Sequence, residues 1–65
     1  MGEEMRRLWM SYGEHLMREA KKLLEQAKQA EKEGELDLAM CLASNSNMLA
    51  TAASCALHTA KEAVS

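Results

Sequence analysis

The sequence predicts an all-α fold: an antiparallel hairpin of two long helices, at about residues 3–33 and 35–64. The chain has no proline and only three glycines, so little interrupts a helix over most of its 65 residues. Alanine, leucine, methionine, glutamate and lysine dominate, and all of them favour helices. Apolar residues recur at spacings of three and four, the period of an α-helix. Together these features predict two helices and no sheet.

The first predicted helix has one main apolar stripe, with charged residues on the opposite face. The stripe comprises Met5, Trp9, Tyr12, Leu16, Ala20, Leu23, Ala27 and Ala30. A second line recurs every seven residues beside it, at Met10, Met17 and Leu24. Gly34 follows this helix and suits the left-handed conformation that ends one. We therefore expect the chain to fold back at Gly34.

The second predicted helix carries no aspartate, glutamate, lysine or arginine from Leu38 to Ala60. One apolar seam runs along Leu36, Ala39, Ala43, Ser46, Ala50, Ala53, Leu57, Ala60 and Val64. Another lies about 100° round the helix, at Leu38, Leu42, Leu49, Ala52, Ala56 and Ala63. A helix without charge on nearly every side is normally buried on nearly every side. One neighbouring helix covers only one of these seams.

Folding back at Gly34 places large residues of the first helix opposite small residues of the second, as close packing requires. The predicted core inside the hairpin is Trp9, Tyr12, Leu16, Leu23, Ala43, Ala50, Ala53 and Leu57. The remaining apolar lines predict an interface with another chain, at Met10, Met17, Leu24, Leu38, Leu42, Leu49, Ala52 and Ala56. Exposed together, they would form a larger patch than monomers usually carry. The sequence therefore predicts a four-helix bundle completed by association.

The length allows one domain, residues 1–65, and the opening Met1-Gly2 suggests that it was excised from a larger protein. Cys41 and Cys55 lie about 21 Å apart along one helix, too far for a disulfide between them. Free cysteines predict a reducing, intracellular location, in the cytoplasm or nucleus. Mixed charges with a net value of −2 predict no nucleic-acid partner. Polar residues within the uncharged stretch argue against membrane insertion.

The sequence predicts no enzyme, no cofactor and no metal. Cys55, His58 and Glu62 share a helical face and could begin a zinc site, but a small buried thiol beside a histidine that points to solvent explains them better. No glycine-rich phosphate loop and no convergent pair of carboxylates is present. A polar line also follows the second helix and has two readings, a hydrogen-bonding surface or an ordinary solvent-facing side. Its members are Ser44, Asn47, Thr51, Ser54 and His58.

Residues 20–49 resemble the first two helices of MIT domains, the microtubule-interacting and trafficking modules. The resemblance rests on a rhythm of small residues, an acidic-glycine turn and the start of the next helix. The matching positions are Ala20, Leu23, Ala27, Ala30, Glu33, Gly34, Leu36, Ala39 and Leu42. MIT domains are three-helix bundles whose grooves take peptide tails of partner proteins, so the resemblance implies a groove of that kind.

Two functions follow as expectations. The first is a protein interaction module that associates with a second copy of itself, as a dimerisation or scaffolding element. The alternative is an MIT-like module that binds a helical or extended peptide of another protein in a groove. Both assign the chain to protein binding, and they differ in the occupant of the apolar surface.

Overall fold

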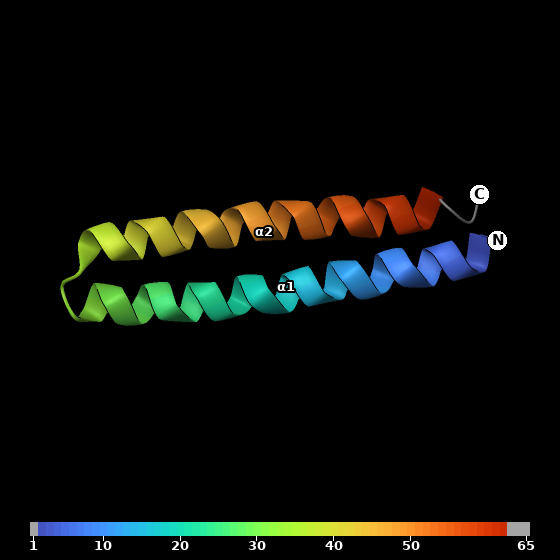
Figure 1. Ribbon diagram of the computed structural model, residues 1–65. Coiled ribbons are helices and arrows are strands. Elements are labelled where there is room, and N and C mark those ends of the chain that lie inside the picture. Colours follow the sequence, from blue (N-terminus) through green and yellow to red (C-terminus); the bar gives the residue numbers. More distant parts are fainter. Residues whose placement is uncertain (1, 63–65) are drawn as a thin grey trace.

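The computed structural model describes residues 2–62, which form two helices, α1 (Gly2–Lys32) and α2 (Leu36–Glu62), and no strand. The helices run antiparallel and pack side by side, so that the start of α1 and the end of α2 lie together (Figure 1). The all-α hairpin is confirmed. Three of its predicted helix ends agree within one residue, and the fourth, at residue 64, lies outside the described residues.

The turn is formed by Gly34, whose φ of +79° lies in the left-handed region that glycine adopts without strain. Two hydrogen bonds close the end of α1. The amide of Glu35 donates to the carbonyl of Ala30 at 2.9 Å, and that of Gly34 donates to Glu31 at 3.0 Å. This pair of bonds is the Schellman motif, which satisfies carbonyls that a helix end leaves free. The carbonyl of Glu35 then accepts from Ala39 and starts α2.

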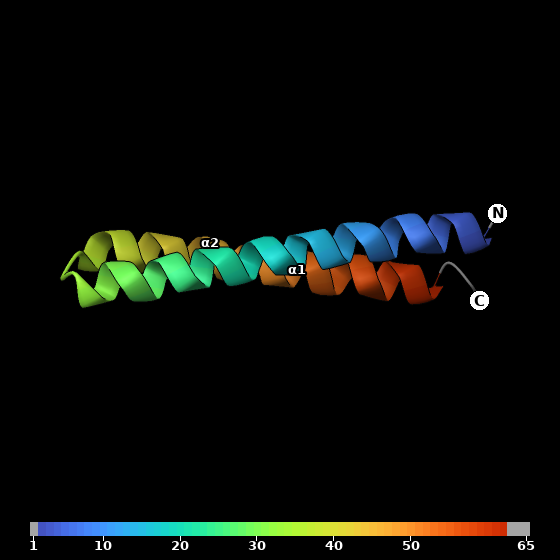
Figure 2. The ribbon, with the colours of Figure 1, turned by 90° about the horizontal axis from the view of Figure 1, so that it is seen from below.

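The core between the helices is built from small side chains. The buried apolar residues in the described part of the chain are one leucine and six alanines: Leu16, Ala20, Ala27, Ala30, Ala53, Ala56 and Ala60. Gly13 and Ser46 are buried with them. Small residues recur every seven positions on both helices, a period that suits helices wound gently about each other. Figure 2 shows the two helices crossing at a shallow angle.

Two contacts show how closely the helices approach. The hydroxyl of Ser46 donates a 2.7 Å hydrogen bond to the backbone carbonyl of Ala20 on the facing helix. Farther from the turn, a Cβ added to Gly13 would lie 2.9 Å from Cγ and Cδ2 of Leu57 and 3.3 Å from the carbonyl oxygen of Ala53. Side chains of ordinary size at these positions would force the helices apart. Gly13 was missed in the sequence, although it stands seven residues before Ala20.

We expect Gly13→Ala to destabilise the hairpin by about 1 kcal/mol. Alanine improves helix propensity by about 1 kcal/mol, but overpacking a close contact costs about 1–3 kcal/mol, and here Leu57 and a backbone oxygen are both too near. Thermal unfolding followed by circular dichroism measures the difference. Ser11→Ala, at an exposed position of the same helix, should be slightly stabilising. A Gly13→Ala variant more stable than the parent would contradict the close approach.

The observed core differs from the predicted one at Tyr12, Ala43 and Ala56. Leu16 and Ala53 are buried, and Trp9, Leu23, Ala50 and Leu57 are half-buried. Tyr12 is instead 52% exposed, with its ring packed edge-on against Trp9 at 6.1 Å, and Ala43 is exposed. Ala56, expected at the inter-chain interface, is only 2% exposed and lies in the core.

The differences at Ala43 and Ala56 have one cause, a rotation of α2. The side of α2 that contacts α1 is centred between the row of Ser46, Ala53 and Ala60 and the row that contains Ala56. This centre is about 50° round the helix from the centre of the predicted core residues. Facing the small row of Ser46, Ala53 and Ala60 toward α1 lets the backbones come closer and gain more contacts. Along the axis, Ser46 meets the backbone carbonyl of Ala20.

Candidate interaction surface

Two hollows lie on one side of the hairpin between the two helices, and a line of apolar residues runs through both. Seven residues define this side, the groove face: Met10, Met17 and Leu24 on α1, and Leu36, Ala43, Ala50 and Leu57 on α2. Met10 and Leu57 line a hollow at the open end of the hairpin. Leu24, Leu36 and Ala43 line a second hollow near the turn. The half-buried Met17 and Ala50 continue both rows between the hollows.

The groove face is apolar along its middle, and its large side chains near the turn are exposed. Leu24 is 43% exposed, Leu36 is 60% exposed, and Met40, beside them in the same hollow, is 71% exposed. The side chains at its centre on α2 are alanines, whereas Leu36 and Leu57 stand near its ends. A surface hollowed by small residues and flanked by flexible methionines suits the side chains of a second helical pair.

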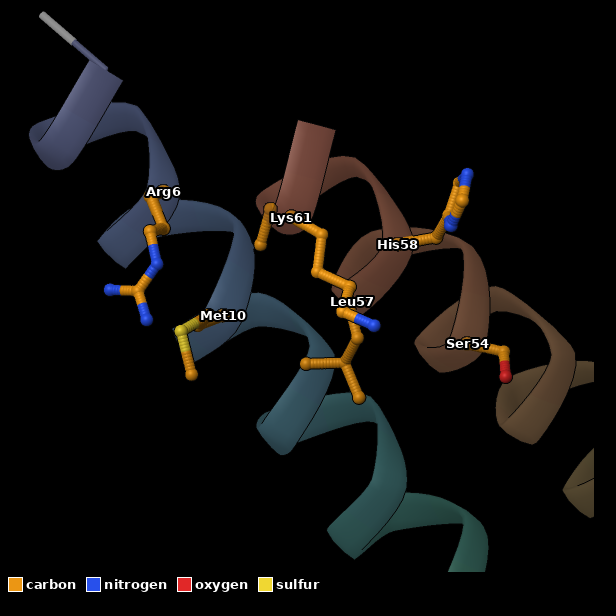
Figure 3. A pocket seen from close by; sticks show the side chains of 7 residues that line it. Arg6, Met10, Ser54, Leu57, His58 and Lys61 are labelled. Atoms are coloured by element: carbon orange, nitrogen blue, oxygen red, sulfur yellow. The ribbon is translucent and has the colours of Figure 1, made fainter. Parts of the chain in front are cut away.

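The two ends of the groove differ in charge. Arg6 and Lys61 flank Met10 and Leu57 at the open end (Figure 3). Arg6 also lies 3.5 Å from Glu3, and the other acids near this end balance its basic residues. The turn end is acidic, because five acids and two lysines lie from residue 25 to residue 37. Its acids are Glu25, Glu31, Glu33, Glu35 and Asp37.

The predicted inter-chain residues do not lie on one side. Met10 and Met17 are half-buried and Leu24 is exposed, all on the groove face. Leu42 and Leu49 are half-buried, because they precede Ala56 on the same seven-residue row and lie at the contact with α1. Leu38 and Ala52 are exposed beyond that row. Leu42 precedes Ala43 by one residue, about 100° of helix. The two lines were expected to merge into one patch, and the rotation of α2 separates them.

A second apolar patch lies at the beginning of α1, lined by Met5, Leu8, Trp9 and Tyr12. Leu8 is 64% exposed and was overlooked in the sequence, although it stands three residues after Met5 and four before Tyr12. Tyr12 follows Met10 by two residues, about 200° of helix, and so points away from the groove face. This patch is short and local, whereas the groove face follows both helices.

The candidate chemical residues are all exposed. Nε2 of His58 lies 3.3 Å from a carboxylate oxygen of Glu62, and both cysteines are free thiols. Within residues 2–62, no three histidine, cysteine, aspartate or glutamate side chains gather closely enough to hold a metal ion. The five residues of the polar line also face solvent, and Thr51 donates to the carbonyl of Asn47 in its own helix. Among the helices described, none is long and apolar enough to cross a membrane.

The resemblance to MIT domains concerns only their first two helices, and within residues 2–62 the structure describes two helices. No family model, no curated protein and no solved structure matches it.

Proposed function

We propose that this chain is a protein interaction module that associates with a second copy of itself through the groove face, to form a four-helix bundle. The observation that carries the proposal is the mismatch between core and surface. Alanines fill most of the contact between the helices, whereas Leu24 and Leu36 on the groove face and Met40 beside it are exposed. Each buried alanine methyl contributes only about 0.8 kcal/mol, so the larger side chains have more to gain from burial.

The exposed area supports a second copy as the occupant. The chain exposes 4951 Å², whereas a compact monomer of 7.2 kDa exposes about 4,100 Å² by the usual scaling with mass. The excess, about 800 Å², is what each partner buries in a protein interface of standard size. The radius of gyration, 14.8 Å, likewise exceeds the roughly 11 Å of a compact domain of this length. Pairing two hairpins side by side would give more compact proportions.

The uncharged stretch of α2 also favours self-association. A long apolar groove needs an occupant of matching length and with few charges, and the groove face of a second copy has both properties. Two-fold pairing of identical surfaces is the commonest way in which soluble proteins associate. The result would be a dimerisation or scaffolding element.

Light scattering coupled to size exclusion at micromolar concentration tests the proposal. We expect a mass of twice the 7.2 kDa chain, and helicity that decreases on dilution, because folding and pairing are coupled by mass action. A stably folded monomer over the whole concentration range would refute self-association. If that monomer gained thermal stability on adding a helical segment of another protein, the groove would be a peptide-binding site of the MIT-like kind.

A further inference from the structure

We propose that the two hairpins pair head to tail, with the turn of each lying over the open end of the other. The inference rests on the proposed self-association and adds to it the orientation of the partner. It commits the groove face to one occupant, the same face of a second copy turned end for end.

Two symmetric arrangements can cover the groove face. If both turns lie at the same end, α1 packs on the partner's α2. If the turns lie at opposite ends, α1 packs on the partner's α1, and α2 packs on the partner's α2. Both arrangements make each helix antiparallel to its neighbours, as in most short-loop bundles. Packing direction alone therefore does not choose between them.

The apolar rows are centred so that turning one copy end for end keeps them in contact. Met17 is the middle residue of α1, and Ala50 lies next to the middle of α2. Positions seven residues to either side then meet, which places Met10 against the partner's Leu24 and Ala43 against the partner's Leu57. The second pairing sets a small side chain against a large one, as interdigitated cores require. The head-to-tail arrangement thus buries the groove face along its length.

Charge decides between the two arrangements. With both turns at one end, the two sets of five acids and two lysines would lie within about one helix diameter of each other, and like charges this close repel. With the turns at opposite ends, each acidic turn meets an end whose charges balance and whose groove is flanked by Arg6 and Lys61. The acidic turns then lie almost the full 49 Å of the hairpin apart, several screening lengths in physiological salt.

Distances between spin labels test the orientation directly. Cys41→Ser and Cys55→Ser remove the two exposed thiols, and Glu33→Cys then provides one labelling site at the turn of each chain. Pulsed electron resonance should give a distance close to the 49 Å length of the hairpin. Turns at the same end would give about 25 Å or less, because the labels would be separated by about two helix diameters.

A label near the middle of α1 separates failure of the orientation from failure of self-association. Arg18→Cys, at an exposed position, should give a distance of about 30 Å or less in either arrangement, since a four-helix bundle is about two helix diameters wide. A short distance from both sites would overturn the head-to-tail pairing and leave self-association intact. The absence of any distance from both sites would overturn both proposals.

Discussion

Ala53→Leu is expected to destabilise the hairpin by about 3 kcal/mol, at the upper end of the usual cost of overpacking. Ala53 is 0% exposed and its carbonyl oxygen lies against Gly13, at the point where the helices come closest. Three extra carbon atoms have no space there, so the helices must separate and lose the contacts of neighbouring alanines. Small domains are stable by only a few kcal/mol, so most of the cooperative melting transition should disappear.

Ala52→Leu is the matched control, because it makes the same change one residue away at an exposed position. Both leucines retain good helix propensity, so a difference between the variants reports packing alone. Thermal denaturation followed by circular dichroism should show a midpoint for Ala52→Leu close to that of the parent. The midpoint for Ala53→Leu should be lower by 10 °C or more, since 1 kcal/mol shifts a domain of this size by about 4–8 °C. Equal midpoints would contradict the observed placement of α2.

The hairpin could be predicted from the sequence because its determinants are local. Helix propensity and the absence of proline set the extent of both helices. One glycine then decides the turn, because the residue that ends α1 needs a left-handed backbone, and Gly34 has a φ of +79°. Each of these signals lies within a few residues of the feature that it predicts.

The rotation of α2 could not be predicted with the same confidence, because it depends on a comparison between two packed surfaces. Nearly every side of α2 is apolar or small, so periodicity distinguishes its rows poorly. What selects the contact side is the depth of approach, which Gly13 permits opposite Leu57 and Ala53. The signal was a seven-residue repeat of small side chains at Gly13, Ala20 and Ala27. Recognising that repeat as a contact row of α1 would have placed Gly13 in the core.

The same rotation changed the candidate interface. Large side chains were expected to gather on one patch, but Leu42 and Leu49 are half-buried on the row of Ala56, and Leu38 is exposed beyond that row. In their place, Leu36, Ala43 and Leu57 complete the groove beside Leu24 and Met10. A prediction of the interacting residues therefore required the packing of the hairpin first, since the interface consists of what that packing leaves uncovered.

Ala43→Glu is expected to weaken dimer formation at least about a hundredfold, a cost of about 3 kcal/mol in association free energy. Ala43 is exposed in the single hairpin and lies on the groove face, so a carboxylate there remains hydrated in the monomer. Pairing of two groove faces would remove the charge from water, which costs several kcal/mol, and Lys28, which lines the same hollow, would offset only part of that cost. Sedimentation equilibrium of the variant and the parent measures the change in dissociation constant.

Ala52→Glu provides the opposing test, because it places the same charge at an exposed position of α2 beyond the buried row. This variant should dimerise within about threefold of the parent, since its carboxylate stays in solvent when the groove faces pair. The reverse outcome, with Ala52→Glu dissociated and Ala43→Glu unaffected, would move the interface to the side of Leu38 and Ala52. Because both variants replace alanine by glutamate on one helix, propensity and net charge cancel in the comparison. The difference therefore identifies the side of the hairpin on which the second copy binds.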